Sequence, residues 1–224
     1  MKKSLRYIAA AALTAASFAA SAAVSITEVA PWASGNSLVK ADWFELTNTG
    51  SSAVDISGWM VDDSSNSFAS AVALNGISSI AAGQSVIFIE GSDSTAASFT
   101  TNWFGANIPA DLAVGYYSGS GIGLSTNGDA VNIFNAAGVV QASVGFGASD
   151  ATVPYQTFDN AAGLTNTTIS QLSVVGMNGA FVAANSVNEI GSPGSIAAVP
   201  EPKSYAMLLA GLGFIGALAR KRQR

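Results

Sequence analysis

The sequence predicts an all-β sandwich or barrel, and three observations lead to this prediction. Short runs of about four to eight β-branched and aromatic residues are separated by turns rich in Gly, Asn, Ser and Asp. Between the two ends of the chain, no segment shows a sustained helical period. The 224 residues are 49% hydrophobic but only 10% charged, and they include 23 glycines, a composition typical of a loop-rich β protein.

The individual strands follow from the two-residue period and from turn residues. Phe44 and Leu46 fall on one face of their strand. Residues 85–89 are apolar throughout, as in a strand that is buried on both faces. Asn135–Gly138 separates two runs and predicts a β-hairpin with a four-residue loop. In chain order we expect strands at residues 24–29, 42–47, 53–56, 58–61, 85–89, 130–134 and 139–144, with weaker strands near 168–174 and 179–183.

Charge and composition exclude several kinds of chemistry. Between Val24 and Val199 the chain has one basic residue, Lys40, and 13 acidic residues, a net charge of −12. Such a body repels the phosphates of nucleic acid, so we expect no nucleic-acid partner. The sequence has no Cys and no His. It therefore lacks thiolate nucleophiles, Cys-ligated metal sites and Ser-His-Asp triads, and we predict no enzymatic activity.

The N-terminus is typical of a secretory signal peptide. Met1–Arg6 is positively charged and Tyr7–Ala20 is apolar. Ser21–Ala23 consists of residues with small side chains. We expect a signal peptide over residues 1–23, used by the export machinery and removed by signal peptidase after Ala22 or Ala23. A permanent membrane helix is the less favoured alternative, because the apolar run is short and ends in small residues.

The C-terminus combines a Pro-Glu-Pro motif, an apolar run at about residues 205–219 and a basic tail. As a helix the 15-residue run rises about 22 Å, which is short of the ~30 Å hydrocarbon core of a membrane. The basic tail nevertheless indicates a stop-transfer signal, which stays on the cytoplasmic side. We expect a marginal single-pass helix that anchors the precursor, with the body outside the cytoplasm. The motif residues are Pro200, Glu201 and Pro202, and the tail residues are Arg220, Lys221, Arg222 and Arg224.

This ending, residues 199–224, resembles the PEP-CTERM sorting signal of Gram-negative bacteria. The resemblance implies recognition by an exosortase, a membrane protease-transpeptidase, with cleavage near the Pro-Glu-Pro motif. The mature chain is then released or attached at the surface, often alongside exopolysaccharide. The motif is thus a site on which another enzyme acts. The alternative is a Pro-rich linker before an ordinary tail anchor.

The middle of the chain contains two blocks of strand residues, Asp42–Asn48 and Val54–Trp59, followed by Gly191–Gly194 near its end. Together with residues 26–29, 82–86 and 127–131, these blocks resemble the lamin-tail domain. The resemblance implies an immunoglobulin-like β-sandwich over residues 24–196, with the two blocks on adjacent strands. The sequence departs from the family pattern around residues 92–117, where a Ser/Thr/Ala-rich insertion occurs.

Four residues of these blocks have physical roles that the sequence suggests. We expect Trp43 and Trp59 to fill the core between two sheets, because each supplies a large apolar area. Glu28 and Glu45 lie within strands, where carboxylates are depleted, so each either faces solvent or accepts hydrogen bonds. A structural or solvated role is favoured over a catalytic one.

The loop after the second block concentrates oxygen atoms at Asp62 and Asp63, which could hold Ca²⁺ together with Asp55 or Asn48. The loop lacks EF-hand spacing, and a solvated loop is the favoured interpretation, so no cofactor is predicted. We interpret the chain as a non-catalytic binding or structural module of the cell surface or extracellular matrix, with exopolysaccharide or envelope proteins as partners. The alternative is a calcium-dependent or hydrolase-accessory domain that uses the acidic loop.

Overall fold

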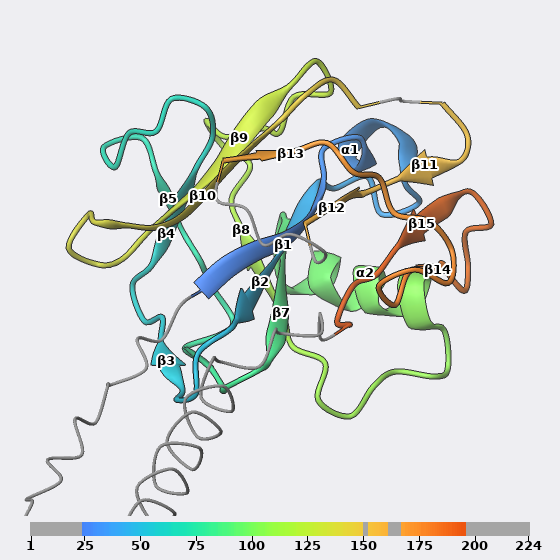
Figure 1. Cartoon of the computed structure of the whole chain (residues 1–224), viewed down its shortest axis with the longest axis horizontal. Coiled ribbons are helices and arrows are strands. Elements are labelled where there is room, and N and C mark those ends of the chain that lie inside the picture. The colour runs from blue at the N-terminus through green and yellow to red at the C-terminus, as the bar shows by residue number, and fades with distance from the viewer. Residues whose placement is uncertain (1–23, 150–151, 161–166, 196–224) are drawn as a thin grey trace, which may run out of the picture.

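Two five-stranded sheets form the body of the protein (Figure 1). The computed structural model describes residues 24–149, 152–160 and 167–195. The first sheet, sheet I, has the order β12-β1-β2-β7-β8. Its strands are β1 (Val24–Ala30), β2 (Trp43–Asn48), β7 (Ser85–Glu90), β8 (Val114–Tyr117) and β12 (Phe158–Asp159).

Sheet II has the order β13-β10-β9-β4-β5 and packs against one face of sheet I. The predicted hairpin is confirmed, because β9 and β10 pair antiparallel with Phe134 opposite Val140. The strands of sheet II are β4 (Met60–Asp62), β5 (Val72–Ala73), β9 (Asp129–Phe134), β10 (Val140–Phe146) and β13 (Thr168–Ile169).

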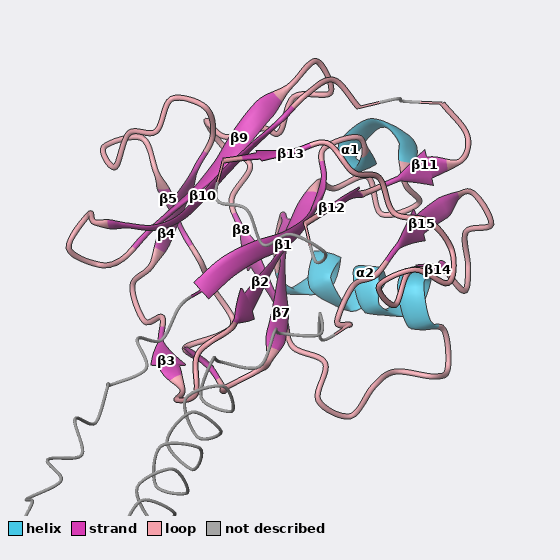
Figure 2. Cartoon of the chain, in the orientation of Figure 1, coloured by secondary structure: helices cyan, strands magenta, loops and turns pink. Residues whose placement is uncertain are grey.

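Two small sheets and two helices complete the described part of the chain (Figure 2). Strand β3 pairs with β6, and a three-stranded sheet has the order β11-β15-β14. The mostly stranded content confirms the predicted all-β class. The remaining elements are β3 (Val54–Asp55), β6 (Ser79–Ile80), β11 (Tyr155–Gln156), β14 (Phe181–Val182), β15 (Glu189–Gly191), α1 (Ala33–Asn36) and α2 (Asp93–Phe104).

The larger core lies between sheets I and II. Phe44, Leu46 and Phe88 point into it from sheet I, and Val61 and Ile133 point into it from sheet II. The predicted shared face of Phe44 and Leu46 is therefore confirmed. Strand β7 is buried on both faces as predicted, because alternate residues enter this core and a second one on the far side of the sheet.

Helix α2 covers that far side, and the sequence did not predict it. It lies in the Ser/Thr/Ala-rich insertion and begins where the Thr95 hydroxyl accepts a hydrogen bond from the Ser92 backbone N–H, 3.1 Å away. Ala96, Phe99 and Trp103 recur at helical spacing and are buried. The expectation that no segment of the body is helical is therefore wrong for this insertion.

Trp43 packs beneath α2 and not between the two sheets. Its ring forms edge contacts with Phe99 and Trp103, at centroid distances of 5.3 and 5.6 Å. Trp59 does join the core between the sheets. The prediction for the two tryptophans is thus confirmed for Trp59 and wrong for Trp43. Among the described residues, no helix is long and apolar enough to cross a membrane.

Candidate functional site

A pair of buried carboxyl groups, Glu28 and Glu45, lies on the α2 side of sheet I. The two residues are direct neighbours in the register of β1 and β2. A β-bulge between Ile26 and Glu28 shifts the alternation of β1, so that Thr27 and Glu28 both turn away from the core between the sheets. Glu28 is fully buried and Glu45 is 2% exposed. We refer to these two side chains as the carboxyl pair.

The end of the described chain supplies hydrogen-bond donors to the carboxyl pair. The Ser192 backbone N–H donates to Glu28 Oε1 at 2.7 Å, and the Ser192 hydroxyl donates to Glu28 Oε2 at 3.1 Å. The Gly194 backbone N–H donates to Glu45 Oε2 at 2.6 Å. Two residues far along the chain are thereby fastened to the first two strands of the domain.

Hydroxyl groups surround the carboxyl pair and link it into a network. Thr27 donates to Glu45 at 2.6 Å, and Thr157 donates to Glu28. The Thr27 hydroxyl is also 2.9 Å from the Thr47 hydroxyl, because both residues point to the α2 side of neighbouring strands. These bonds satisfy oxygen atoms that burial removes from water, which is the condition for keeping polar groups inside a protein.

Burial raises the pKa of both members of the carboxyl pair. It raises the pKa of Glu28 to about 7; the charge of Asp159 adds to this shift, while the hydrogen bonds from Thr157 and Ser192 oppose it. Burial also raises the pKa of Glu45 well above its ordinary value, and the charge of Glu28 adds to it.

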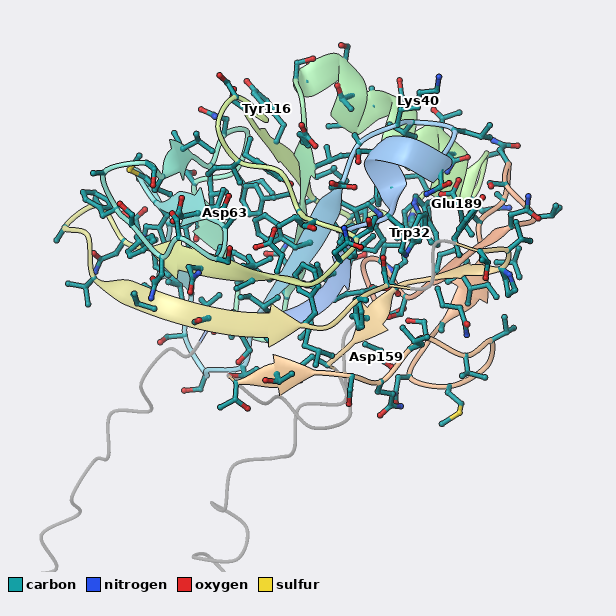
Figure 3. All side chains as sticks on the ribbon, turned by 90° about the horizontal axis from the view of Figure 1, so that it is seen from above. Trp32, Lys40, Asp63, Tyr116, Asp159 and Glu189 are labelled. Atoms are coloured by element: carbon teal, nitrogen blue, oxygen red, sulfur yellow. The ribbon has the colours of Figure 1, made fainter. Side chains whose placement is uncertain are left out.

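No basic side chain offsets these charges within the part of the chain that the structure describes. Its single basic residue is Lys40, which is exposed. Figure 3 shows Lys40 and Asp159 on opposite sides of the domain. The sequence allowed either solvent exposure or hydrogen bonding for the two glutamates, and the structure confirms hydrogen bonding.

A second set of buried acidic groups consists of Asp42, which directly precedes β2, and Glu189 on β15, and the sequence did not predict it. Asp42 accepts a hydrogen bond from the Ser34 backbone N–H at 2.7 Å. Burial raises its pKa to about 7, and the charge of Glu90 adds to the shift. Glu189 on β15 accepts a hydrogen bond from the Asn102 side-chain amide at 3.0 Å, and burial raises its pKa.

The two aspartates of the acidic loop, Asp62–Asn66, accept hydrogen bonds from the loop and from residues just after it. Asp62 is 1% exposed and accepts hydrogen bonds from the Ser65 hydroxyl and from the Ser67 backbone N–H. Asp63 accepts one from the Ser65 backbone N–H at 2.9 Å. Across residues 24–149, 152–160 and 167–195, no three His, Cys, Asp or Glu side chains gather as metal ligands. The loop is ordered by its own hydrogen bonds.

The side chains of the two other residues considered as calcium ligands, Asp55 and Asn48, also accept hydrogen bonds in local turns. Asp55 accepts a hydrogen bond from the Ser57 backbone N–H, and Asn48 accepts one from the Gly50 backbone N–H, both at 2.9 Å. Each of these side chains thus has one oxygen atom engaged in a local turn.

The remaining predicted sites lie outside the described residues. They are the signal-cleavage residues, the sorting motif and the basic tail, together with the apolar run at about residues 205–219. By residue these are Ala22, Ala23, Pro200, Glu201, Pro202, Arg220, Lys221, Arg222 and Arg224.

Comparison with protein families gives a match to the Lamin Tail Domain over residues 17–148, more than half of the chain. The chain belongs to the lamin-tail domain family. A second match, to the PEP-CTERM protein-sorting motif, covers residues 198–223 and implies export and recognition by an exosortase. Both resemblances that the sequence suggested are thereby confirmed. Comparisons with curated proteins and with solved structures gave no significant match.

Three of the sequence segments that carry the lamin-tail resemblance meet at the carboxyl pair. Glu28 comes from residues 26–29, Glu45 from the block Asp42–Asn48, and Ser192 and Gly194 from the block Gly191–Gly194. Residues after 148 belong to the same packed body, because β12 and β13 pair with β1 and β10. In this lamin-tail domain the last block therefore serves to cover and satisfy two carboxyl groups of the first two strands.

Gly191 is expected to be intolerant of a side chain. An added Cβ would lie 2.6 Å from Glu28 Oε1, 2.9 Å from the Trp103 ring and 3.0 Å from Thr157 Cγ2, and all three neighbours are buried. We expect Gly191→Ala to lower the free energy of unfolding by about 1–3 kcal/mol, the usual range for overpacking. Denaturant titration of the full chain measures this change.

Gly123→Ala is the matched control, because an added Cβ there meets no atom within 4 Å and the residue does not have positive φ. Equal stability of the two variants would contradict the close packing at Gly191.

Proposed function

We propose that this chain is an exported, non-catalytic binding or structural module that an exosortase sorts to the cell surface or extracellular matrix. The observation that carries the proposal is that the sorting motif directly follows the folded lamin-tail domain in the chain. The sorting motif begins at residue 198, only three residues after Ser195, whose backbone carbonyl accepts a hydrogen bond from β7 at 3.4 Å. A folded lamin-tail domain directly followed by a sorting motif is the arrangement expected of a cargo that the motif delivers.

The state of the acidic side chains supports a non-catalytic role. A glycosidase needs two carboxyl groups that face a substrate in an open cleft. The carboxyl pair is buried, and its oxygen atoms accept hydrogen bonds from the protein. The hydrogen bonds within the acidic loop, Asp62–Asn66, likewise give the calcium-dependent or hydrolase-accessory alternative no support.

The surface composition and the export route together favour exopolysaccharide or envelope proteins as partners. The described domain carries many Ser, Thr and Asn side chains and a single basic residue. We propose that residues 24–196 form the module that makes these contacts and that the membrane anchor is transient.

Intact-mass analysis of the protein from its producing cells tests the sorting step. We expect the wild-type chain to lack both the signal peptide and the residues after the Pro-Glu-Pro motif. A variant with Pro200→Ala, Glu201→Ala and Pro202→Ala should keep its C-terminus and stay in the membrane fraction. Ser204→Ala, which lies beside the motif, is the control and should be processed normally. Equal masses for the wild type and the triple variant would overturn exosortase sorting.

Binding of the full-length protein to immobilised exopolysaccharide from the same cells tests the partner. We expect retention that survives moderate salt, because the acidic body has a single basic residue and so offers little charge attraction to an anionic group that salt could screen. Absence of retention at every salt concentration would leave the sorting step intact and remove exopolysaccharide as the partner.

A further inference from the structure

A surface hollow lies between helix α2, the loop before β2 and the turn that joins β14 to β15. Its volume of about 310 Å³ falls at the lower end of the range for small-molecule sites. No ionisable side chain of the described residues lines it. We call it the α2 hollow, and its lining residues are Leu38, Val39, Ser98, Thr101, Asn102 and Asn185.

Helix α2 supplies the polar wall of the α2 hollow. Ser98, Thr101 and Asn102 are spaced three and four residues apart, so they lie on one side of the helix. The helix belongs to the insertion at which the sequence departs from the lamin-tail pattern, and every lining residue lies outside the segments that carry the family resemblance. The α2 hollow is therefore a feature of this chain's own sequence.

Glu189 on β15 holds two walls of the α2 hollow together. One of its oxygens accepts a hydrogen bond from the Leu38 backbone N–H at 3.3 Å, and the other accepts one from the Asn102 side-chain amide at 3.0 Å. The third wall is tied to the helix as well, because the Asn185 side-chain amide donates to the Thr101 carbonyl at 2.8 Å. Walls that are fixed in advance lower the entropy cost of binding a ligand.

The side-chain oxygen of Asn102 is buried without a hydrogen-bond partner. Asn102 is 5% exposed, and its amide nitrogen faces Glu189, so its Oδ1 is turned away from that carboxyl group. Among the buried side-chain atoms of the described residues, the other orphan is the Tyr117 hydroxyl, which lies in the core between the sheets. Because a buried acceptor without a donor is costly, the Asn102 oxygen points to a donor that a ligand of the α2 hollow supplies.

The hydroxyls of the α2 hollow are also available as acceptors. Ser98 donates its hydroxyl proton to the Ser94 carbonyl at 3.0 Å, and Thr101 donates to the Ala97 carbonyl at 3.1 Å. Each hydroxyl oxygen keeps lone pairs that can accept a hydrogen bond. The polar wall therefore suits a ligand that carries several hydroxyl donors.

We propose that the α2 hollow binds one neutral sugar unit of an extracellular polysaccharide, which rests on the proposed role in binding exopolysaccharide and gives that role a site. The sugar hydroxyls donate to the Asn102 oxygen and to the two hydroxyls of the helix. The apolar face of the sugar ring packs on Leu38 and Val39. A neutral unit fits better than an acidic one, because no basic side chain lines the α2 hollow and residues 24–199 carry a net charge of −12.

Retention of the full-length protein on immobilised exopolysaccharide from the same cells tests the site, in a detergent that has no sugar head group. We expect Ser98→Trp, which fills the α2 hollow from an exposed position, to weaken binding by about tenfold or more relative to the wild type. Ala97→Trp is the matched control, because Ala97 is the adjacent exposed residue of α2 and does not line the hollow. It should be retained as the wild type. If Ser98→Trp does not fold, Thr101→Trp is used in the same way.

Nuclear magnetic resonance of the side-chain amides identifies the class of ligand. The probes are the neutral and the acidic oligosaccharide fractions cut from the same exopolysaccharide. We expect the neutral fraction to shift the side-chain amide signals of Asn102 and Asn185 in the wild type and in Ala97→Trp. The acidic fraction should leave both signals in place, and neither fraction should move them in Ser98→Trp.

The outcomes separate this site from the proposed function. Equal retention of the wild type and Ser98→Trp would overturn the α2 hollow as the site and leave exopolysaccharide binding intact. Equal losses in Ser98→Trp and Ala97→Trp would also overturn it, as would amide shifts with the acidic fraction alone or with neither fraction. A wild-type protein that is not retained at all would remove exopolysaccharide as the partner, and the site with it.

Discussion

The free energy of unfolding is expected to fall as the pH rises from about 4.5 to 8. Folding raises the pKa of Glu28 to about 7 and also raises the pKa values of Glu45, Asp42, Glu90 and Glu189. A group with a raised pKa binds more protons in the folded state than in the unfolded state. Its stabilising contribution is complete below the unfolded pKa and is lost as the pH rises through the folded pKa. Glu28 alone corresponds to about 3 kcal/mol over this window.

Guanidinium titrations followed by tryptophan fluorescence measure this dependence, because all four tryptophans are buried. Glu28→Gln should reduce the slope of the curve between pH 5 and 8, while the other groups with raised pKa values keep part of it. Asp93→Asn should leave it unchanged, because Asp93 is exposed at the start of α2. A stability that increases with pH across this window is typical of carboxylates paired with cations. That result would contradict the burial of the carboxyl pair without a cationic partner.

Most strands of the two large sheets could be predicted from the sequence because their pattern is local, but the short strands β5, β8 and β12 were not predicted. Alternation placed Phe44 and Leu46 on one face, and the continuous apolar run of β7 indicated burial on both faces. Helix α2 was missed because seven of its 12 residues are Ser, Thr, Asn or Asp, which are poor helix formers in the middle of a helix. Its signal was the spacing of Ala96, Phe99 and Trp103, which was visible in the sequence but weak within a polar insertion.

From the sequence, Glu28 and Glu45 could be predicted only either to face solvent or to accept hydrogen bonds. The choice between the two depends on residues from distant parts of the chain. Glu28 and Ser192 are 164 residues apart, and Glu45 and Gly194 are 149 residues apart. Local patterns identify the two faces of a strand but do not show which segment covers the outer one. The same limit explains the wrong prediction for Trp43. The strand period places its side chain on one face of β2, but it does not show that α2 covers that face.

The Trp43→Ala variant is expected to lose about 4 kcal/mol of unfolding free energy, which lies in the range for removal of a large buried aromatic side chain. Trp43 is 1% exposed and holds the two rings of α2 through edge contacts with Phe99 and Trp103. The helix should therefore lose hydrogen-exchange protection more than β9, which belongs to the opposite sheet. Denaturant titration gives the overall loss, and exchange of peptides from residues 93–104 gives its location.

Two comparisons make this result specific. Trp59→Ala removes a ring of the same size from the core between the sheets, so it should lower stability without a selective effect on α2. Phe68→Ala removes a ring that is 39% exposed and should have a smaller effect. A uniform loss of protection in the Trp43→Ala variant would contradict its assignment to the α2 side.

Trp43 and Glu45 lie two residues apart on one face of β2, so water that enters the cavity left by the Trp43 ring also approaches the carboxyl pair. The Trp43→Ala variant should then show a shallower decline of stability with pH than the wild type, because Glu45 would be less completely buried.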